Sequence, residues 1–181
     1  NKTNTLLPAL DTISHCLESL WNIASGVETR NYAYRGLQLS NEALPQLLQE
    51  NNSLKNREKM QLASTYGGIA ISKTKTAIAH ALSYKFTNDF DIPHGLACSF
   101  TLLPLIEIQK ANIAHNSFEE NILKETSKLL RVIDPLKLII QDLGKELIID
   151  TLGKVANPER FLNYSGNAYT DIKKISKFVK E

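Results

Sequence analysis

Two of the four histidines of the chain, His80 and His94, lie fourteen positions apart in very different local sequences. His80 ends a run of small and apolar residues, whereas His94 lies between Pro93 and Gly95 after a polar stretch. Imidazole nitrogens are common ligands of transition metals. A shared metal ion would therefore explain the pair, provided that the chain supplies further ligands.

A second pair of candidate ligands, Asp11 and His15, lies near the start of the chain with a spacing of four residues. On an α-helix this spacing places both side chains on one face, about 6 Å apart along the axis. A carboxylate oxygen and an imidazole nitrogen at that offset can reach one ion at about 2.0–2.2 Å each. Such a pair is common by chance, so it carries weight only together with His80 and His94.

Three imidazoles and one carboxylate would suit zinc, divalent iron or another first-row ion, and they would not suit calcium or magnesium. The fourth histidine, His115, lies in a polar stretch and is predicted to be a surface residue. The spacing leaves a second interpretation equally open, in which Asp11 caps a helix or forms an ion pair and the other three histidines are packing residues.

The elements that would position these residues are predicted to be helices. Apolar residues recur at three- and four-residue steps along most of the chain, and strand-like alternation is hard to find. This periodicity predicts an all-α helical bundle that forms a single domain over residues 1–181. The expected helices cover residues 8–24, 28–49, 57–84, 117–132, 135–154 and 169–180, and another begins near residue 93. Residues 87–92 are expected to form a loop, and Pro104 should kink or restart the helix that follows it.

Local signals indicate where some of these helices begin and pack. Ser53 or Asn56 is expected to cap the helix that follows a polar break, and Asp134, which precedes a proline, is a cap-and-first-turn signal. Gly67 and Gly68 lie inside a helical pattern, where each costs about 1 kcal/mol relative to alanine. We therefore expect a close helix contact at these glycines, either in the core or near an active-site cleft.

Composition excludes several classes of function. Lys and Arg number 21 against 19 Asp and Glu, and no basic stretch with interleaved aromatics indicates a nucleic-acid surface. No apolar run approaches the roughly 20 residues needed to cross a membrane. Since the first residues also lack the layout of a signal peptide, we expect a cytoplasmic protein in which Cys16 and Cys98 are reduced core thiols. The first residue is not Met, so the chain is expected to be a fragment or a processed piece.

Three segments together carry a resemblance to a known family. Residues 11–18 match a D-A-x-x-H-x-x-E helix, with Thr12 in place of the alanine, and residues 79–95 match an A-H-x(12)-P-H-G segment. Between them, REKMQLASTYGGIAIS looks like the pattern A-R-x-x-M-x-x-A-S-x-x-A-G-x-A-F. The chain thus resembles the helical C-terminal domain of the iron-containing (group III) alcohol dehydrogenases, which have a dehydroquinate-synthase-like fold. The resemblance covers most of residues 1–110 and fades over the last 70.

The resemblance implies that Asp11, His15, His80 and His94 are the metal ligands and that the metal is Fe²⁺ or Zn²⁺. The ion would polarise the oxygen of a small alcohol or aldehyde substrate during hydride transfer. The cofactor, NAD(H) or NADP(H), would be bound by a nucleotide-binding domain that is absent from this chain. We therefore expect the chain by itself to be inactive, and the whole enzyme to be a homo-oligomer, such as a dimer.

Two further residues receive expectations from the same resemblance. Many members of the family have a second histidine four residues after the first histidine of the A-H-x(12)-P-H-G segment, where this chain has Tyr84. Tyr84 is therefore a candidate catalytic residue, which could bind substrate or join a proton relay. Glu18, one turn beyond His15, is expected either to orient a metal ligand or to form an ordinary surface salt bridge.

The substrate class remains open between alternatives. AHALSY and PHGLACSFTL resemble the branch of the family that acts on phosphonate aldehydes, such as the phosphonoacetaldehyde reductases. Lys73, Lys75 and Lys85 would offer cations to a phosphonate, or they are solvated helix residues. The alternatives are a glycerol-dehydrogenase-like zinc enzyme that acts on polyols, a non-catalytic helical domain stabilised by a metal, and a helical interaction module without metal.

Overall fold

The computed structural model describes residues 2–49, 53–111, 113–115, 117–155 and 157–181. Its helices, in chain order, are α1 (Lys2–Leu20), α2 (Val27–Gln49), α3 (Leu54–Thr74), α4 (Ile78–Phe90), α5 (His94–Ala97), α6 (Leu102–Lys110), α7 (Phe118–Ile133), α8 (Pro135–Leu143), α9 (Lys145–Leu152), the 3₁₀ helix η1 (Pro158–Asn163) and α10 (Ala168–Lys180). The described residues form no strand beyond an isolated bridge between Asn22 and Tyr164. The expected all-α fold is confirmed.

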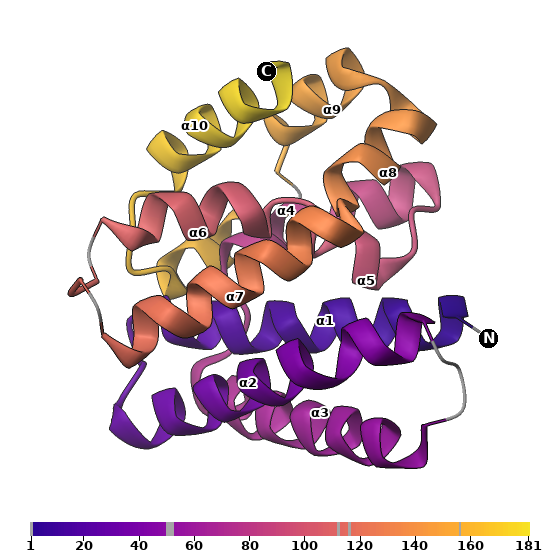
Figure 1. Ribbon diagram of the computed structural model, residues 1–181. Coiled ribbons are helices and arrows are strands. Elements are labelled where there is room, and N and C mark those ends of the chain that lie inside the picture. The colour runs from indigo at the N-terminus through magenta and orange to yellow at the C-terminus, as the bar shows by residue number, and fades with distance from the viewer. Residues whose placement is uncertain (1, 50–52, 112, 116, 156) are drawn as a thin grey trace.

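Helix α1 runs through the middle of the molecule. It packs against α2 and α3 on one side and against α4 and α5 on the other (Figure 1). The later helices cover the remaining faces, with α7 in contact with α2 and α6, and α10 in contact with α6 and α9. Because α1 is surrounded, it buries apolar residues such as Leu10, Ile13 and Leu17 together with polar ones such as Glu18. None of the helices in the described ranges has the length and apolar character needed to cross a membrane.

The prediction of one long helix over residues 57–84 is wrong, because the structure divides this stretch into α3 and α4. The break follows Thr74, where Lys75 adopts a left-handed backbone with φ of 67°. Non-glycine residues rarely adopt this conformation, and apolar periodicity does not report it. The break bears on the candidate site, since His80 belongs to the first turn of a separate helix.

Other boundaries also differ from the expectations. The predicted helix 135–154 is divided into α8 and α9 at Gly144, which has φ of 77°, and α4 extends through most of the expected loop as far as Phe90. Helix α1 begins six residues before the expected start and includes Pro8. Pro104 was expected either to kink a helix or to begin a new one. It lies in the first turn of α6, so a new helix begins there.

The predicted caps and one of the two glycine contacts are confirmed. Ser53 and Asp134 each accept a hydrogen bond from a backbone N–H in the first turn of the following helix. Gly67 lies against α1, where an added Cβ would be 3.4 Å from the carbonyl oxygen of Thr12, whereas a Cβ at Gly68 would face open space. The glycine pair therefore serves helix packing at one position only.

Candidate metal centre

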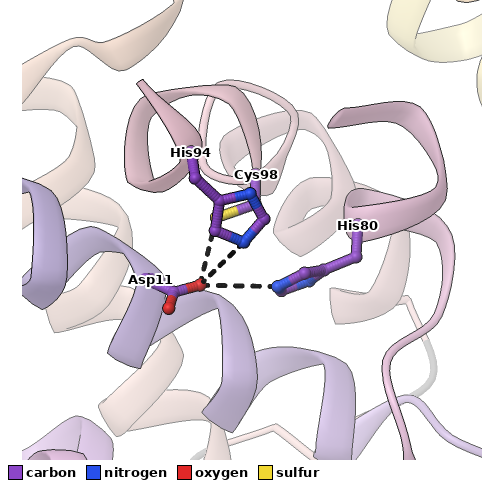
Figure 2. A group of neighbouring side chains, drawn as sticks. All are labelled: Asp11, His80, His94 and Cys98. Atoms are coloured by element: carbon purple, nitrogen blue, oxygen red, sulfur yellow. Dashed lines mark hydrogen bonds and ion pairs between the residues drawn. The ribbon is translucent and has the colours of Figure 1, made fainter. Parts of the chain in front are cut away.

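Three separate elements bring the predicted ligands together. Helix α1 carries Asp11 and His15 on one face, α4 carries His80 in its first turn, and His94 is the first residue of α5. Figure 2 shows the side chains of His80 and His94 directed toward the carboxylate of Asp11. Residues more than 80 positions apart in the sequence thus meet at one point.

A single oxygen atom, Asp11 Oδ1, lies at the centre of this cluster. It is 3.5 Å from His15 Nε2, 3.4 Å from His80 Nε2 and 3.7 Å from His94 Nε2. The imidazole rings also contact one another, since the His15 and His80 rings stack with centroids 5.1 Å apart and those of His80 and His94 lie 5.3 Å apart. All three Nε2 atoms therefore surround one carboxylate oxygen.

These distances fit donors that share one ion. Two donors about 2.0–2.2 Å from the same ion, at angles of about 90–110°, are roughly 2.8–3.6 Å apart. The N–O distances of His15 and His80, 3.5 and 3.4 Å, lie inside that range and that of His94, 3.7 Å, lies just beyond it, so small movements would close the site around an ion. The nitrogen His80 Nε2 is buried and has no hydrogen-bond partner within the described residues, an arrangement that a buried polar atom seldom adopts. A metal ion would satisfy it.

Glu18 fixes the orientation of His80. Its carboxylate is fully buried and accepts three hydrogen bonds, from Ala79 N at 2.6 Å, from His80 N at 3.2 Å and from His80 Nδ1 at 2.6 Å. Because Nδ1 donates a hydrogen bond to this carboxylate, Nε2 is the nitrogen that faces Asp11 and that a metal ion would bind in exchange for a proton. Glu18 was expected either to orient a metal ligand or to form a surface salt bridge, and its complete burial rules out the salt bridge at the surface.

The same carboxylate also begins helix α4. Ala77, at the N-cap position, makes no side-chain capping bond, and the first-turn N–H groups of Ala79 and His80 donate to Glu18 instead. A negative charge at a helix N-terminus is favourable, since it satisfies unpaired donors and complements the helix dipole. Glu18 therefore couples the start of α4 to the position of His80.

Charges within the cluster perturb the pKa values of its members. Burial raises the pKa of Asp11, but contact with His80 and the positive charges of His15 and His80 outweigh it and lower the pKa to about 2. Burial lowers the pKa of His80, but the carboxylates of Asp11 and Glu18 outweigh this effect and raise the pKa to about 9. For His15, burial prevails over the attraction of Asp11 and lowers the pKa. Without a metal ion the two carboxylates thus favour the protonated form of His80, and a metal ion would take the place of the proton on Nε2.

The structure adds one donor that the sequence analysis placed only among the core thiols. Cys98 Sγ lies 3.4 Å from Asp11 Oδ1. The candidate ligand atoms of Asp11, His80, His94 and Cys98 all lie within 4.8 Å of one another, and His15 falls outside this compact group. The four-residue spacing between His94 and Cys98 is the signal that could have identified the thiol.

A close approach of two backbones holds α5 in position. A Cβ added at Gly95 would collide with the carbonyl group of Leu7 in α1. Only glycine permits this approach. Since His94 precedes Gly95 and Cys98 follows α5, the contact sets the distance from both donors to α1.

The remaining candidates have contacts with other residues. Tyr84 follows His80 by one turn of α4, and the guanidinium carbon of Arg160 lies 5.2 Å from the centre of its ring. His115 is exposed, as expected, and lies 3.4 Å from a Glu120 oxygen. The cations proposed for a phosphonate are divided among different surroundings: Lys73 and Lys85 form surface ion pairs, whereas Lys75 lines a hollow of about 590 Å³ that Arg160 also lines.

Comparison with known sequences identifies relatives of the chain. Alcohol dehydrogenase 4 of Saccharomyces cerevisiae is 29% identical over 160 residues, an alignment that covers 81% of this chain and 41% of the yeast protein. Phosphonoacetaldehyde reductase of Streptomyces viridochromogenes is 30% identical over 127 residues, which cover 70% of this chain and 31% of the reductase. The chain therefore spans less than half the length of these relatives.

Solved structures share the fold at lower identity. An iron-containing alcohol dehydrogenase from Thermotoga maritima superposes with a TM-score of 0.69 and 23% identity, covering 99% of this chain and 50% of that one. An archaeal alcohol dehydrogenase from a Red Sea brine pool gives a TM-score of 0.76 and 20% identity, with 97% and 50% covered. The family model for the C-terminal part of the Fe-containing alcohol dehydrogenases matches residues 5–152, which is most of the chain. The chain belongs to the Fe-containing alcohol dehydrogenase family and carries its C-terminal domain.

Proposed function

We propose that the chain is the metal-binding part of an NAD(P)-dependent alcohol dehydrogenase or aldehyde reductase. In this proposal Asp11, His15, His80 and His94 hold one divalent iron or zinc ion. The observation that carries it is the convergence of the three imidazole Nε2 atoms on Asp11 Oδ1, at 3.4–3.7 Å. Such an ion acts as a Lewis acid that polarises the oxygen of an alcohol or aldehyde.

The residues of the cluster divide the work. Asp11 supplies negative charge at the centre, and Glu18 keeps His80 in the orientation and tautomer that a metal requires. The side chain of His80 is 4% exposed, whereas that of His94 is 45% exposed. Substrate is therefore expected to approach from the side of His94, while the opposite side remains dry.

The nicotinamide cofactor is proposed to bind to a domain outside this chain. The chain spans 41% of the yeast relative and 31% of the reductase, which leaves ample sequence in those proteins for such a domain. In the whole enzyme Tyr84 is proposed to bind the substrate or to pass a proton, with its ring held against Arg160.

A phosphonate aldehyde is the proposed substrate class. Its support is the 30% identity to phosphonoacetaldehyde reductase over 70% of this chain. Lys75 and Arg160 line a common hollow, and the Arg160 guanidinium lies over the Tyr84 ring; these two are the cations proposed to attract the phosphonate. The comparison that tests the substrate class is the kcat/KM of the complete enzyme for phosphonoacetaldehyde, propanal and glycerol; a preference for glycerol would support the polyol alternative instead.

Metal analysis of purified variants tests the proposed centre. The chain refolded with excess Fe²⁺ or Zn²⁺ should retain about one ion after desalting. His80→Ala and His94→Ala should lose it, and in the complete enzyme they should also lose turnover. His115→Ala is the matched control, because this histidine is exposed and lies outside the cluster. Equal metal content in all three variants, or no bound metal in the unsubstituted chain, would refute the proposal.

A metal that raises the melting temperature without any dehydrogenase activity in the complete protein would instead indicate a structural role. The same experiment therefore separates the catalytic proposal from the alternative of a metal-stabilised domain.

A further inference from the structure

The thiol of Cys98 occupies a position that a metal ligand would take. The side chain is completely buried, and its Sγ atom lies 3.4 Å from Asp11 Oδ1 and 3.6 Å from the carbonyl oxygen of Gly95. In Figure 2 the sulfur lies behind the His94 ring, in the group that faces Asp11 and His80. A thiol in the core of a helical bundle normally packs among apolar side chains, whereas this one packs among donors.

The distances agree with coordination by sulfur. An oxygen about 2.1 Å and a sulfur about 2.3 Å from one ion, at angles of about 90–110°, are roughly 3.1–3.6 Å apart. The observed separation of 3.4 Å between Asp11 Oδ1 and Cys98 Sγ falls inside that range. The sulfur also lies within 4.8 Å of a ligand nitrogen of His80 and of His94.

A second observation points into the same space. His80 Nε2 is buried without a hydrogen-bond partner in the part of the chain that the structure describes, and the residue is 3% exposed. The Cys98 thiol hydrogen is directed to Asp11 or Gly95, and the contact of His80 Nε2 with Asp11 Oδ1, at 3.4 Å, does not have the geometry of a hydrogen bond. An ion between the two groups would satisfy both.

We propose that Cys98 binds the metal through its sulfur, as a donor in addition to Asp11, His15, His80 and His94. This inference rests on the proposed metal centre and extends it. On binding, the S–H bond breaks, a sulfur–metal bond forms, and the proton passes to solvent. A thiolate is a soft ligand that suits zinc better than divalent iron, so Cys98 shifts the preference of this chain toward zinc.

Substitution by cobalt provides a direct spectroscopic test. Co²⁺ added to the chain is expected to give visible ligand-field bands, and sulfur coordination adds a charge-transfer band in the near ultraviolet. Cys98→Ser should lose the ultraviolet band and keep the visible ones. Cys16→Ser is the matched control, because Cys16 is the other buried thiol and lies near Gly36 and Gly67 instead of the donors. It should keep both sets of bands.

Three outcomes overturn the inference. Visible bands without the ultraviolet band in the unsubstituted chain would show a metal centre without sulfur, which leaves the proposed function intact. An ultraviolet band that survives Cys98→Ser would show that the sulfur comes from elsewhere. A folded chain that gives no cobalt spectrum at all would remove the metal centre and this inference with it. The spectrum of the unsubstituted chain decides the question even if Cys98→Ser folds poorly.

Competition with a chelator tests the metal preference. Cys98→Ser should weaken zinc binding by about 10–100-fold, which is the loss typical of residues that support a metal site. It should weaken Fe²⁺ binding less. Equal losses for the two metals would contradict the shift toward zinc, and no loss for either would contradict coordination.

Discussion

Replacement of Glu18 by glutamine is expected to weaken metal binding although Glu18 touches no metal. The substitution preserves size and removes the charge. At present the two carboxylate oxygens accept from the backbone of Ala79 and His80 and from His80 Nδ1, at 2.6–3.2 Å. If the one remaining oxygen keeps the backbone bonds, the new NH₂ group faces Nδ1 and can only donate to it.

That reversal changes the tautomer of His80. Nδ1 then accepts a hydrogen bond and the ring proton moves to Nε2, which removes the lone pair that would bind the ion. Hydrogen bonds to a charged group contribute about 1.5–3 kcal/mol each, and loss of such an outer partner typically weakens metal binding 10–100-fold. The latter corresponds to about 1.4–2.8 kcal/mol. We expect Glu18→Gln to fall within this range.

Zinc affinity is measured by chelator competition, with circular dichroism to verify folding. The matched control is Glu42→Gln, since Glu42 forms an exposed ion pair with Lys59 and is expected to leave zinc affinity unchanged. A folded Glu18→Gln protein that binds zinc within twofold of the unsubstituted chain would refute the positioning role.

Three further predictions concern the helix contacts, the pH dependence of stability and the proton relay. Gly95→Ala should destabilise the chain by about 1–3 kcal/mol and weaken zinc binding, because the new methyl group collides with the Leu7 carbonyl. Gly68→Ala, whose methyl group faces open space, should instead stabilise the chain by up to about 1 kcal/mol. Chemical denaturation of the two variants measures both changes. In the metal-free chain, folding raises the pKa of His80 from about 6.5 to about 9, so the protonated ring stabilises the folded state. This stabilisation, up to about 3 kcal/mol, is fully present below pH 6.5 and is lost as the pH rises through 9. Urea unfolding between pH 6 and 10 measures this loss, and a His80→Gln variant with the same pH profile would contradict it. In the complete enzyme, Tyr84→Phe should lower kcat with metal content unchanged, and unchanged kcat across the pH range would exclude Tyr84 from proton transfer.

The fold class and the meeting of the four predicted ligands were within reach of the sequence. Helical periodicity indicates where apolar faces lie, and the four-residue spacing of Asp11 and His15 is a property of one helix. The approach of His80 and His94 to that helix rested on a family resemblance, because no local rule relates segments about 70 residues apart.

The features that were missed depend on single backbone angles and on tertiary contacts. The break at Lys75 requires a left-handed conformation that apolar periodicity does not report, and the division at Gly144 depends on one positive φ. The burial of Glu18 and the inward position of Cys98 follow from the packing of α4 and α5 on α1. The sequence left Glu18 between two roles and placed Cys98 only among the core thiols, because the partners of both residues are distant in the chain.

The unequal exposure of the histidines has a kinetic consequence. The His80 ring is held by its hydrogen bond to Glu18, and its side chain is 4% exposed. The side chain of His94 is 45% exposed and lies at the start of a helix of only four residues. An incoming ion is therefore expected to meet His94 first and to shed its last water molecules against His80. Loss of the ion should begin with release of His94. The rate at which a chelator removes the metal from the protein therefore reports the mobility of that one imidazole.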